Sequence, residues 1–415
     1  MENVSSLGDE KHAMSRQRKL RSLSRLRGRA GVGALSASHI VEIAPTRHAS
    51  RDDLPRKRGL CVKANLRFSK TELNMELGMA YRQVGQASFA DALASRRGKG
   101  GAVLRRICEL VDWAAIERVL RGLPEPERGA PPYPRLVMFK ALLLQQWYGL
   151  SDPELEEALD DRTSFREFCG FVLGDETPDH TTIWRFREAL QQASLDETLF
   201  SEILRQIDAR GLVLRRGTLI DASLIPSAVK PPKPPKEPLP PGPDGRAPSK
   251  LVNSERDADA RWTKKGGKRY FGYKAHVGVD QSSAIIRRSK LTDAAVNDTV
   301  PADELISGDE KAVYADQAYD KHERRAGLAA RGIKPRLMFR PNKHHALTER
   351  QKRFNDAVGR RRAPVEQVFA RLKGVYGWAR ARYLGLARNH THLRLLCLAM
   401  NLKRWAILRP IGVPA

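Results

Sequence analysis

The stretch Gly217-Thr218-Leu219-Ile220-Asp221 is the clearest structural signal in the second half of the chain. It is a short apolar run without helical period, which predicts a buried strand that ends in a carboxylate. The stretch Ala312-Val313-Tyr314-Ala315-Asp316 has the same form. One strand-terminal Asp often only caps a turn. Two of them predict a pair of carboxylates that rigid strand ends hold close together.

The residues around these two strands predict a mixed sheet flanked by helices, an α/β fold. Alternation at 273–280 predicts a strand, and 284–291 is its expected hairpin partner. The further expected elements are helices at 298–306, 319–331, 361–375 and 393–408 and a short strand at 336–339. The Pro-rich segment 230–248 predicts a linker or an exposed loop, since proline removes a backbone donor. The basic stretch 340–353, with His344 and His345, predicts a DNA-contacting loop.

The first half predicts short, closely connected helices. The expected helices are 103–120, 134–147, one that Ser151 and Glu154 open as a capping box, 164–169, and one that Asp179 caps over 181–193. We therefore expect a second domain over 211–408, which contains the strands, and a helical N-terminal domain over 79–210, which could place one helix in a DNA groove. Arg185 and Arg187 are its candidate DNA contacts. The alternative is that these arginines are only solvated.

Residues 1–78 are basic and show no sustained period, which predicts disorder. Two interpretations stay open. The segment is either an arm that binds DNA, or it lies upstream of a true start at Met75 or Met79.

The charge balance points to a polyanionic partner. The chain has 74 Lys and Arg against 48 Asp and Glu, a net charge of +26. No apolar run approaches the length that spans a bilayer, and the N-terminus lacks the apolar core of a signal peptide, so we expect a cytoplasmic protein that does not enter membranes. The four cysteines lie too far apart for a zinc knuckle and are expected to be reduced.

A third carboxylate, Glu366, lies on the helix expected at 361–375. Arg362, Glu366 and Lys373 share one helical face at offsets of four and seven residues. This row is either a surface salt-bridge series, or Glu366 ligates a metal while Arg362 and Lys373 bind the DNA backbone. Asp221, Asp316 and Glu366 together suit two Mg²⁺ ions that act on a phosphodiester. Asp280 and Asp320 are competing acidic residues; Asp320 either supports the site or begins a helix.

These motifs resemble the DDE transposases of bacterial insertion sequences, in the superfamily of IS-four and IS-five elements and closest to the IS-five branch. Arg362, Glu366 and Lys373 match three positions of that group's signature, while Gly359 stands where the group has Tyr. The two Asp-terminated strands, Tyr273-Lys274-Ala275-His276-Val277, and Pro178-Asp179-His180-Thr181-Thr182 match further motifs in order. The resemblance covers about residues 81–405.

The resemblance implies an RNase H-like catalytic domain with Asp221, Asp316 and Glu366 as catalytic metal ligands. It implies Mg²⁺-dependent cleavage at terminal inverted repeats, with Mn²⁺ as a substitute, and then strand transfer into target DNA. We also expect a homodimer in the DNA complex and no small-molecule cofactor. The alternatives are a DNA-binding regulator without enzymatic activity and a nuclease of the same fold that does not join strands.

Overall fold

The computed structural model describes residues 81–86, 101–125, 130–230, 254–341 and 346–408. The expectations for 1–78, for His344 and His345, and for nearly all of the Pro-rich segment lie outside these ranges. The first half of the described chain is helical, as predicted. Its helices are α4 (Ala102–Leu110), α5 (Trp113–Leu120), α6 (Arg135–Tyr148), α7 (Asp152–Asp161), α8 (Thr163–Cys169), α9 (His180–Gln192) and α10 (Leu195–Ala209).

Side-chain caps explain where several of these helices begin. Ser151 accepts a hydrogen bond from the Glu154 N–H while the Glu154 carboxylate accepts one from Ser151, which confirms the predicted capping box of α7. Asp179 caps α9 as predicted, and Asp112 caps α5. The single helix expected at 103–120 is instead two, α4 and α5, because Val111 is extended after α4 and the Asp112 side chain caps α5. Helix α10 was not predicted.

A mixed sheet forms the second half. Its strands are β1 (Thr218–Pro226), β2 (Arg261–Lys265), β3 (Lys268–Asp280), β4 (Ile286–Asp293), β5 (Ala312–Ala315) and β6 (Lys334–Leu337). They run in the order β2-β3-β1-β5-β6, and β4 pairs with β3. The pairs of β3 are antiparallel, whereas β1–β5 and β5–β6 are parallel. The structure thus confirms a mixed sheet flanked by helices.

Helices α12 (Glu349–Gly374) and α11 (His322–Ala330) pack against the strands β1, β5 and β6. Helix α12 packs against all three strands, while the shorter α11 packs against β6. Helix α12 begins twelve residues earlier than expected (361 − 349), at Thr348, whose side chain and Gln351 form a capping box. The expectation of a loop as far as 353 is therefore wrong, because 349–353 are helical.

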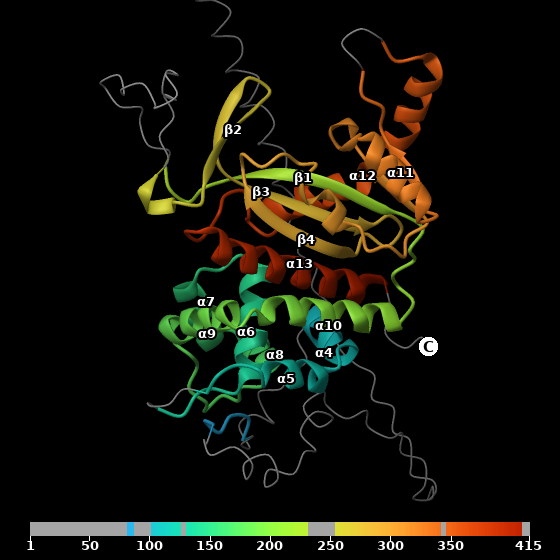
Figure 1. Cartoon of the computed structure of the whole chain (residues 1–415). Coiled ribbons are helices and arrows are strands. Elements are labelled where there is room, and N and C mark those ends of the chain that lie inside the picture. Colours follow the sequence, from blue (N-terminus) through green and yellow to red (C-terminus); the bar gives the residue numbers. More distant parts are fainter. Residues whose placement is uncertain (1–80, 87–100, 126–129, 231–253, 342–345, 409–415) are drawn as a thin grey trace, which may run out of the picture. The chain divides into compact units, whose positions relative to one another are not determined.

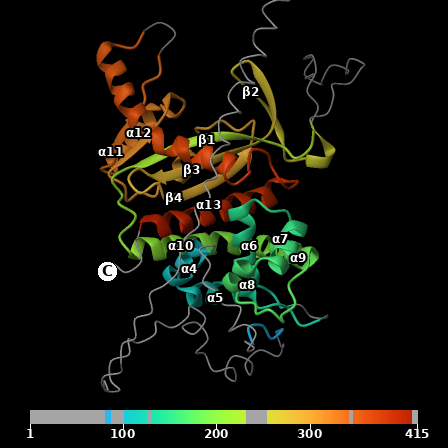
Figure 2. The same ribbon diagram turned by 180° about the vertical axis from the view of Figure 1, so that it is seen from behind.

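Helix α13 (Leu386–Leu408) joins the helical half to the sheet. It packs against β4 on one side and against α10 and α6 on the other, and Figures 1 and 2 show it between these layers. The Asn401 side chain bonds both backbone groups of Ile286 in β4, at 2.9 and 2.8 Å. The Trp147 indole of α6 donates to the Ala399 carbonyl at 2.7 Å. One continuous core therefore includes residues of both halves.

Within the described ranges, no helix combines the length and apolar character that crossing a bilayer requires. The helical half and the sheet half both contribute to the positions of the candidate functional side chains, since α12 lies over the strands and α9 lies against α7 and α13.

Candidate active site

The sheet register places Asp221 and Asp316 at matching positions. Strands β1 and β5 are parallel neighbours, and Leu219 of β1 pairs with Tyr314 of β5. Each Asp follows its paired residue by two positions. One oxygen of each carboxylate accepts a local backbone hydrogen bond, from Ala222 N at 2.9 Å and from Ala318 N at 2.7 Å. In the described part of the chain, the second oxygen of neither Asp has a hydrogen-bond or ion-pair partner.

Arg362 of α12 interacts directly with Asp221. Its Nη2 lies 3.3 Å from Asp221 Oδ1, and the guanidinium is buried with 8% of the residue exposed. Burial raises the pKa of Asp221, the Arg362 charge opposes the rise, and the nearby Asp316 charge adds to it. Arg362 is thus placed to hold a carboxylate in position. Its burial argues against the DNA-backbone contact predicted for it.

Glu366 lies on the same helix, one turn beyond Arg362. Its side chain is exposed, and no hydrogen bond or ion pair joins it to another described residue. Among the residues that the structure describes, no three His, Cys, Asp or Glu side chains gather closely enough to hold a metal ion. The structure therefore brings Asp221, Asp316 and Arg362 together, and it leaves Glu366 on the helix that covers their strands.

Tyr319 is a site residue that sequence reasoning did not single out. It ends the 3-10 turn η3 (Gln317–Tyr319), which Asp316 caps, and 1% of it is exposed. Its hydroxyl has no hydrogen-bond partner among the described atoms. Burial raises the pKa of Tyr319 strongly, and the charges of Asp221, Asp298 and Asp316 raise it further. A buried phenol therefore lies within the field of three carboxylates. The motif Ala315-Asp316-Gln317-Ala318-Tyr319 was the available signal.

A cavity of 690 Å³ opens beside Asp316. It extends from Thr263 of β2 to Arg340, and its charged lining consists of Lys274, Asp298, Asp316, Asp320, Lys321 and Arg340. Lys274 Nζ lies 2.9 Å from Asp298. Both signs of charge line this space, and it is large enough to admit part of a nucleotide chain next to the paired carboxylates.

The two competing acidic residues have structural partners. Asp280 is fully buried and accepts hydrogen bonds from the backbone N–H groups of Arg215, Ser282 and Ser283, so it fixes the turn after β3. Asp320 pairs with Arg325 at 2.6 Å, and α11 begins at Lys321 without a side-chain cap. Asp320 therefore does not cap α11. It lines the cavity with Asp316.

The remaining predicted DNA contacts differ in exposure. Arg185 is exposed on α9. Arg187 is 3% exposed, makes two hydrogen bonds of 2.7 Å to Asp152 and lies 4.6 Å over the Tyr383 ring. This placement argues against a DNA contact for Arg187. Lys373 is half-buried and donates to the Leu224 carbonyl of β1 at 3.0 Å.

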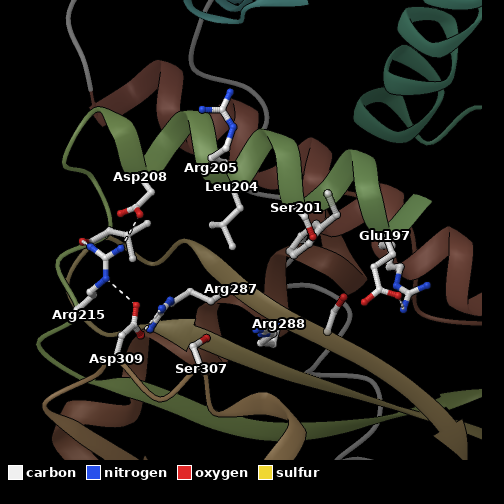
Figure 3. A pocket seen from close by; sticks show the side chains of 14 residues that line it. Glu197, Ser201, Leu204, Arg205, Asp208, Arg215, Arg287, Arg288, Ser307 and Asp309 are labelled. Atoms are coloured by element: carbon white, nitrogen blue, oxygen red, sulfur yellow. Dashed lines mark hydrogen bonds and ion pairs between the residues drawn. The ribbon is translucent and has the colours of Figure 1, made fainter. Parts of the chain in front are cut away.

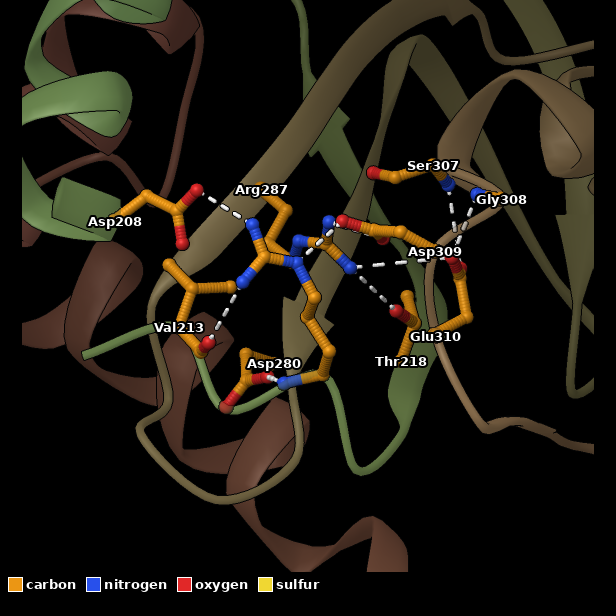
Figure 4. A network of polar contacts seen from close by, with 10 residues as sticks. Asp208, Val213, Thr218, Asp280, Arg287, Ser307, Gly308, Asp309 and Glu310 are labelled. Carbon is orange, nitrogen blue, oxygen red and sulfur yellow. Dashed lines mark hydrogen bonds and ion pairs between the residues drawn. The ribbon is translucent and has the colours of Figure 1, made fainter. Parts of the chain in front are cut away.

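A second cavity, of 440 Å³, lies between α10 and the sheet and is rich in arginine (Figure 3). Figure 4 shows a network of ion pairs and hydrogen bonds that involves some of its lining residues, Arg287, Asp208 and Asp309 among them. Arg215 bridges Asp208 of α10 to Asp309, and Arg287 of β4 also pairs with Asp309. We assign this network to holding α10 against the sheet, because Arg215 and Arg287 connect Asp208 of α10 to β4 through Asp309.

Comparison with known proteins connects this geometry to a class of enzyme. Residues 213–402 match a family model described as "Transposase DDE domain", and residues 92–189 match one described as "Transposase domain (DUF772)". The matches support a DDE transposase. No solved structure matches the chain. The range of the transposase DDE domain contains Asp221, Asp316 and Glu366 as well as Arg362 and Lys373.

Proposed function

We propose that this chain is an insertion-sequence transposase of the IS-four and IS-five superfamily, on the IS-five branch. Its catalytic domain, 211–408, is RNase H-like and cleaves DNA at transposon ends before joining them to target DNA. The helical residues 79–210 form the N-terminal DNA-binding domain, with exposed Arg185 as a contact. The observation that carries the proposal is the matched register of Asp221 and Asp316 within a transposase DDE domain.

The residues fit the Mg²⁺ ions that the family uses. Asp221 and Asp316 lie close together. Burial raises the pKa of Asp221, the Arg362 charge opposes that rise, and the Asp316 charge adds to it. Each carboxylate has one oxygen without a partner among the described residues. Asp221, Asp316 and Glu366 would hold the ions. When bound, Mg²⁺ activates the attacking hydroxyl and stabilises the leaving oxygen.

The chain's own groups would orient these ligands and the DNA. The ion pair of Arg362 with Asp221 of β1 limits the rotamers of the Asp221 side chain, a ligand that must be positioned accurately. Lys373 is fixed by Leu224 near the end of the same strand and supplies a positive charge for a phosphate. Glu366 would reach the ions from α12, the helix that packs against β1 and β5.

The first prediction is that Asp221→Asn, Asp316→Asn and Glu366→Gln each abolish metal-dependent cleavage while DNA binding persists. The substrate is duplex DNA with the inverted repeats found beside the gene, assayed with Mg²⁺ or Mn²⁺. Each substitution removes a charge that a metal ligand needs. Removing one group of a catalytic unit costs orders of magnitude in rate.

Glu349→Gln is the matched control, since Glu349 is an exposed glutamate in the first turn of the same helix. Full cleavage by any of the three carboxylate variants would refute the assignment. A wild-type chain that binds and never cuts would instead be a regulator. A chain that cuts but never joins pre-cut ends would be a nuclease.

A further inference from the structure

The β2–β3 hairpin extends past the rest of the sheet (Figure 1). Strand β1 pairs with β3 only from Gly272 to Asp280, and β4 pairs only from Tyr273 to Val279. The residues of β3 before Gly272 pair with β2 alone. The turn residues Gly266 and Gly267 both have positive φ, 55° and 79°, as a two-residue type I′ turn requires. We call this two-stranded segment, 261–271, the ribbon.

The tip of the ribbon is strongly basic. Lys264, Lys265, Lys268 and Arg269 are all exposed, and none has an ion-pair or hydrogen-bond partner among the described residues. Arginines elsewhere, such as Arg187 and Arg215, are paired with carboxylates. These four cations around two glycines have no carboxylate partner in the described part of the chain, and their local positive field favours a polyanion as partner.

The ribbon also lies beside the candidate active site. Thr263 of β2 lines the same cavity as Asp316. Burial lowers the pKa of Lys373, and the Lys265 charge lowers it further, so these two cations are neighbours.

The two faces of the ribbon are distinguishable from the strand register. Side chains alternate between faces along a strand, and directly paired residues share a face. Lys265 pairs with Lys268, and Thr263 pairs with Tyr270, so these four share the face that includes the cavity-lining Thr263. Lys264 pairs with Arg269 on the opposite face, as do Trp262 and Phe271, whose rings contact each other at the ribbon's base.

We propose that the ribbon binds DNA. Its Lys265–Lys268 face contacts phosphates of the DNA strand that enters the cavity beside Asp316. The inference rests on the proposed function, since it takes the cavity to be the cleavage site. Two-stranded ribbons are a known shape for nucleic-acid contact, and lysine ammonium groups bind phosphate without sequence preference. DNA fits better than an anionic surface because the basic face adjoins the catalytic carboxylates.

The test compares two charge-matched variants of the full chain, Lys265→Gln with Lys268→Gln and Lys264→Gln with Arg269→Gln. Binding to a fluorescein-labelled mixed-sequence duplex is measured as salt rises. Each phosphate contact contributes about 0.9 to the slope of log affinity against log salt, so losing two lowers the slope by about 1.8. The ratio of wild-type affinity to variant affinity should therefore fall roughly tenfold between about 50 and about 200 mM salt.

The variant with Lys265→Gln and Lys268→Gln should have the reduced salt slope and cleave more slowly. The variant with Lys264→Gln and Arg269→Gln should keep most of the wild-type slope. Equal thermal unfolding of both variants and wild type establishes that they are folded. A wild-type slope in the first variant, or an equal loss in the second, would overturn the proposal.

Asp316→Asn separates the ribbon proposal from the proposed function. If Asp316→Asn still cuts, the proposed function fails and the ribbon's binding result stands. If it does not cut and the first variant binds normally, only the ribbon proposal fails.

Discussion

Arg185 and Arg187 lie two positions apart on α9 and have opposite environments. Arg185 is exposed, whereas Arg187 is buried against Asp152 of α7 and the Tyr383 ring. Burial alone would raise the pKa of Asp152, but the hydrogen bonds and charge of Arg187 reverse the effect and lower it. The two charges are therefore stable in the protein interior only as a pair.

We predict that Arg187→Gln destabilises the protein by about 3–5 kcal/mol, because it leaves the Asp152 charge without its partner. Chemical denaturation at neutral pH measures the change. Arg185→Gln, on the same helix, should stay within about 0.5 kcal/mol of wild type. An Arg187→Gln protein with an unchanged denaturation midpoint would show that the pair contributes little.

The sequence could not separate these two arginines. Residues two apart on a helix point about 200° apart, but which side is buried depends on where α7 and Tyr383 pack. Tyr383 is 196 residues away in the chain (383 − 187). The expected roles of both followed from their place on a predicted helix, whereas burial is decided by tertiary contacts that no local pattern contains.

The beginning of α9, by contrast, could be predicted from the sequence, because the capping residue Asp179 is next to the helix it caps. The carboxylate of Asp179 accepts a hydrogen bond from Thr182 N at 2.8 Å and one from the Thr181 hydroxyl at 2.7 Å. These hydrogen bonds hold the pKa of Asp179 at about 2. The ionised side chain satisfies a backbone donor that the helix itself cannot satisfy.

We predict that Asp179→Ala costs about 1 kcal/mol of stability at neutral pH, typical for the loss of an N-cap. Urea denaturation monitored by circular dichroism gives the value. The control is Asp161→Ala, since Asp161 is the exposed last residue of α7 and caps nothing. Equal midpoints for the Asp179 variant and the control would contradict the capping role.

Helix α12 shows why an element can be found and its beginning missed. The expected beginning at 361 lies within one turn of Pro364, which is inside the helix although proline is most common in a first helical turn. The capping box at Thr348 and Gln351 was the better signal. The two Asp-terminated strands were easier to predict, since a buried strand is a short apolar run. The ribbon was missed because its alternation is hidden by consecutive lysines.

At the scale of the whole molecule, buried histidines couple stability to pH. His392 of α13 is buried, and His390 on the same helix is partly buried. Burial lowers the pKa of His390 to about 4, with a further contribution from Arg394. Burial also lowers the pKa of His392 well below 6.5, and Arg382 and Arg187 add to this. The folded protein therefore keeps both rings neutral where the unfolded chain binds protons.

We predict that the free energy of unfolding falls as pH drops from about 6.5 towards 4, by up to about 1.4 kcal/mol per pH unit for each histidine. The sign follows because the unfolded state binds more protons throughout this window. Denaturation at several pH values should give a shallower dependence for His390→Gln than for wild type. His322→Gln, at an exposed position, should leave it unchanged. Parallel curves for wild type and His390→Gln would contradict the prediction.

The position of α13 in the chain has a consequence for synthesis on the ribosome. The helix follows the whole sheet in sequence, yet it packs against α4, α6 and α10 of the helical half. The apolar surface of those early helices stays uncovered until residues 386–408 have left the exit tunnel. A nascent chain therefore exposes it throughout the synthesis of the sheet, when such surface favours aggregation or chaperone binding.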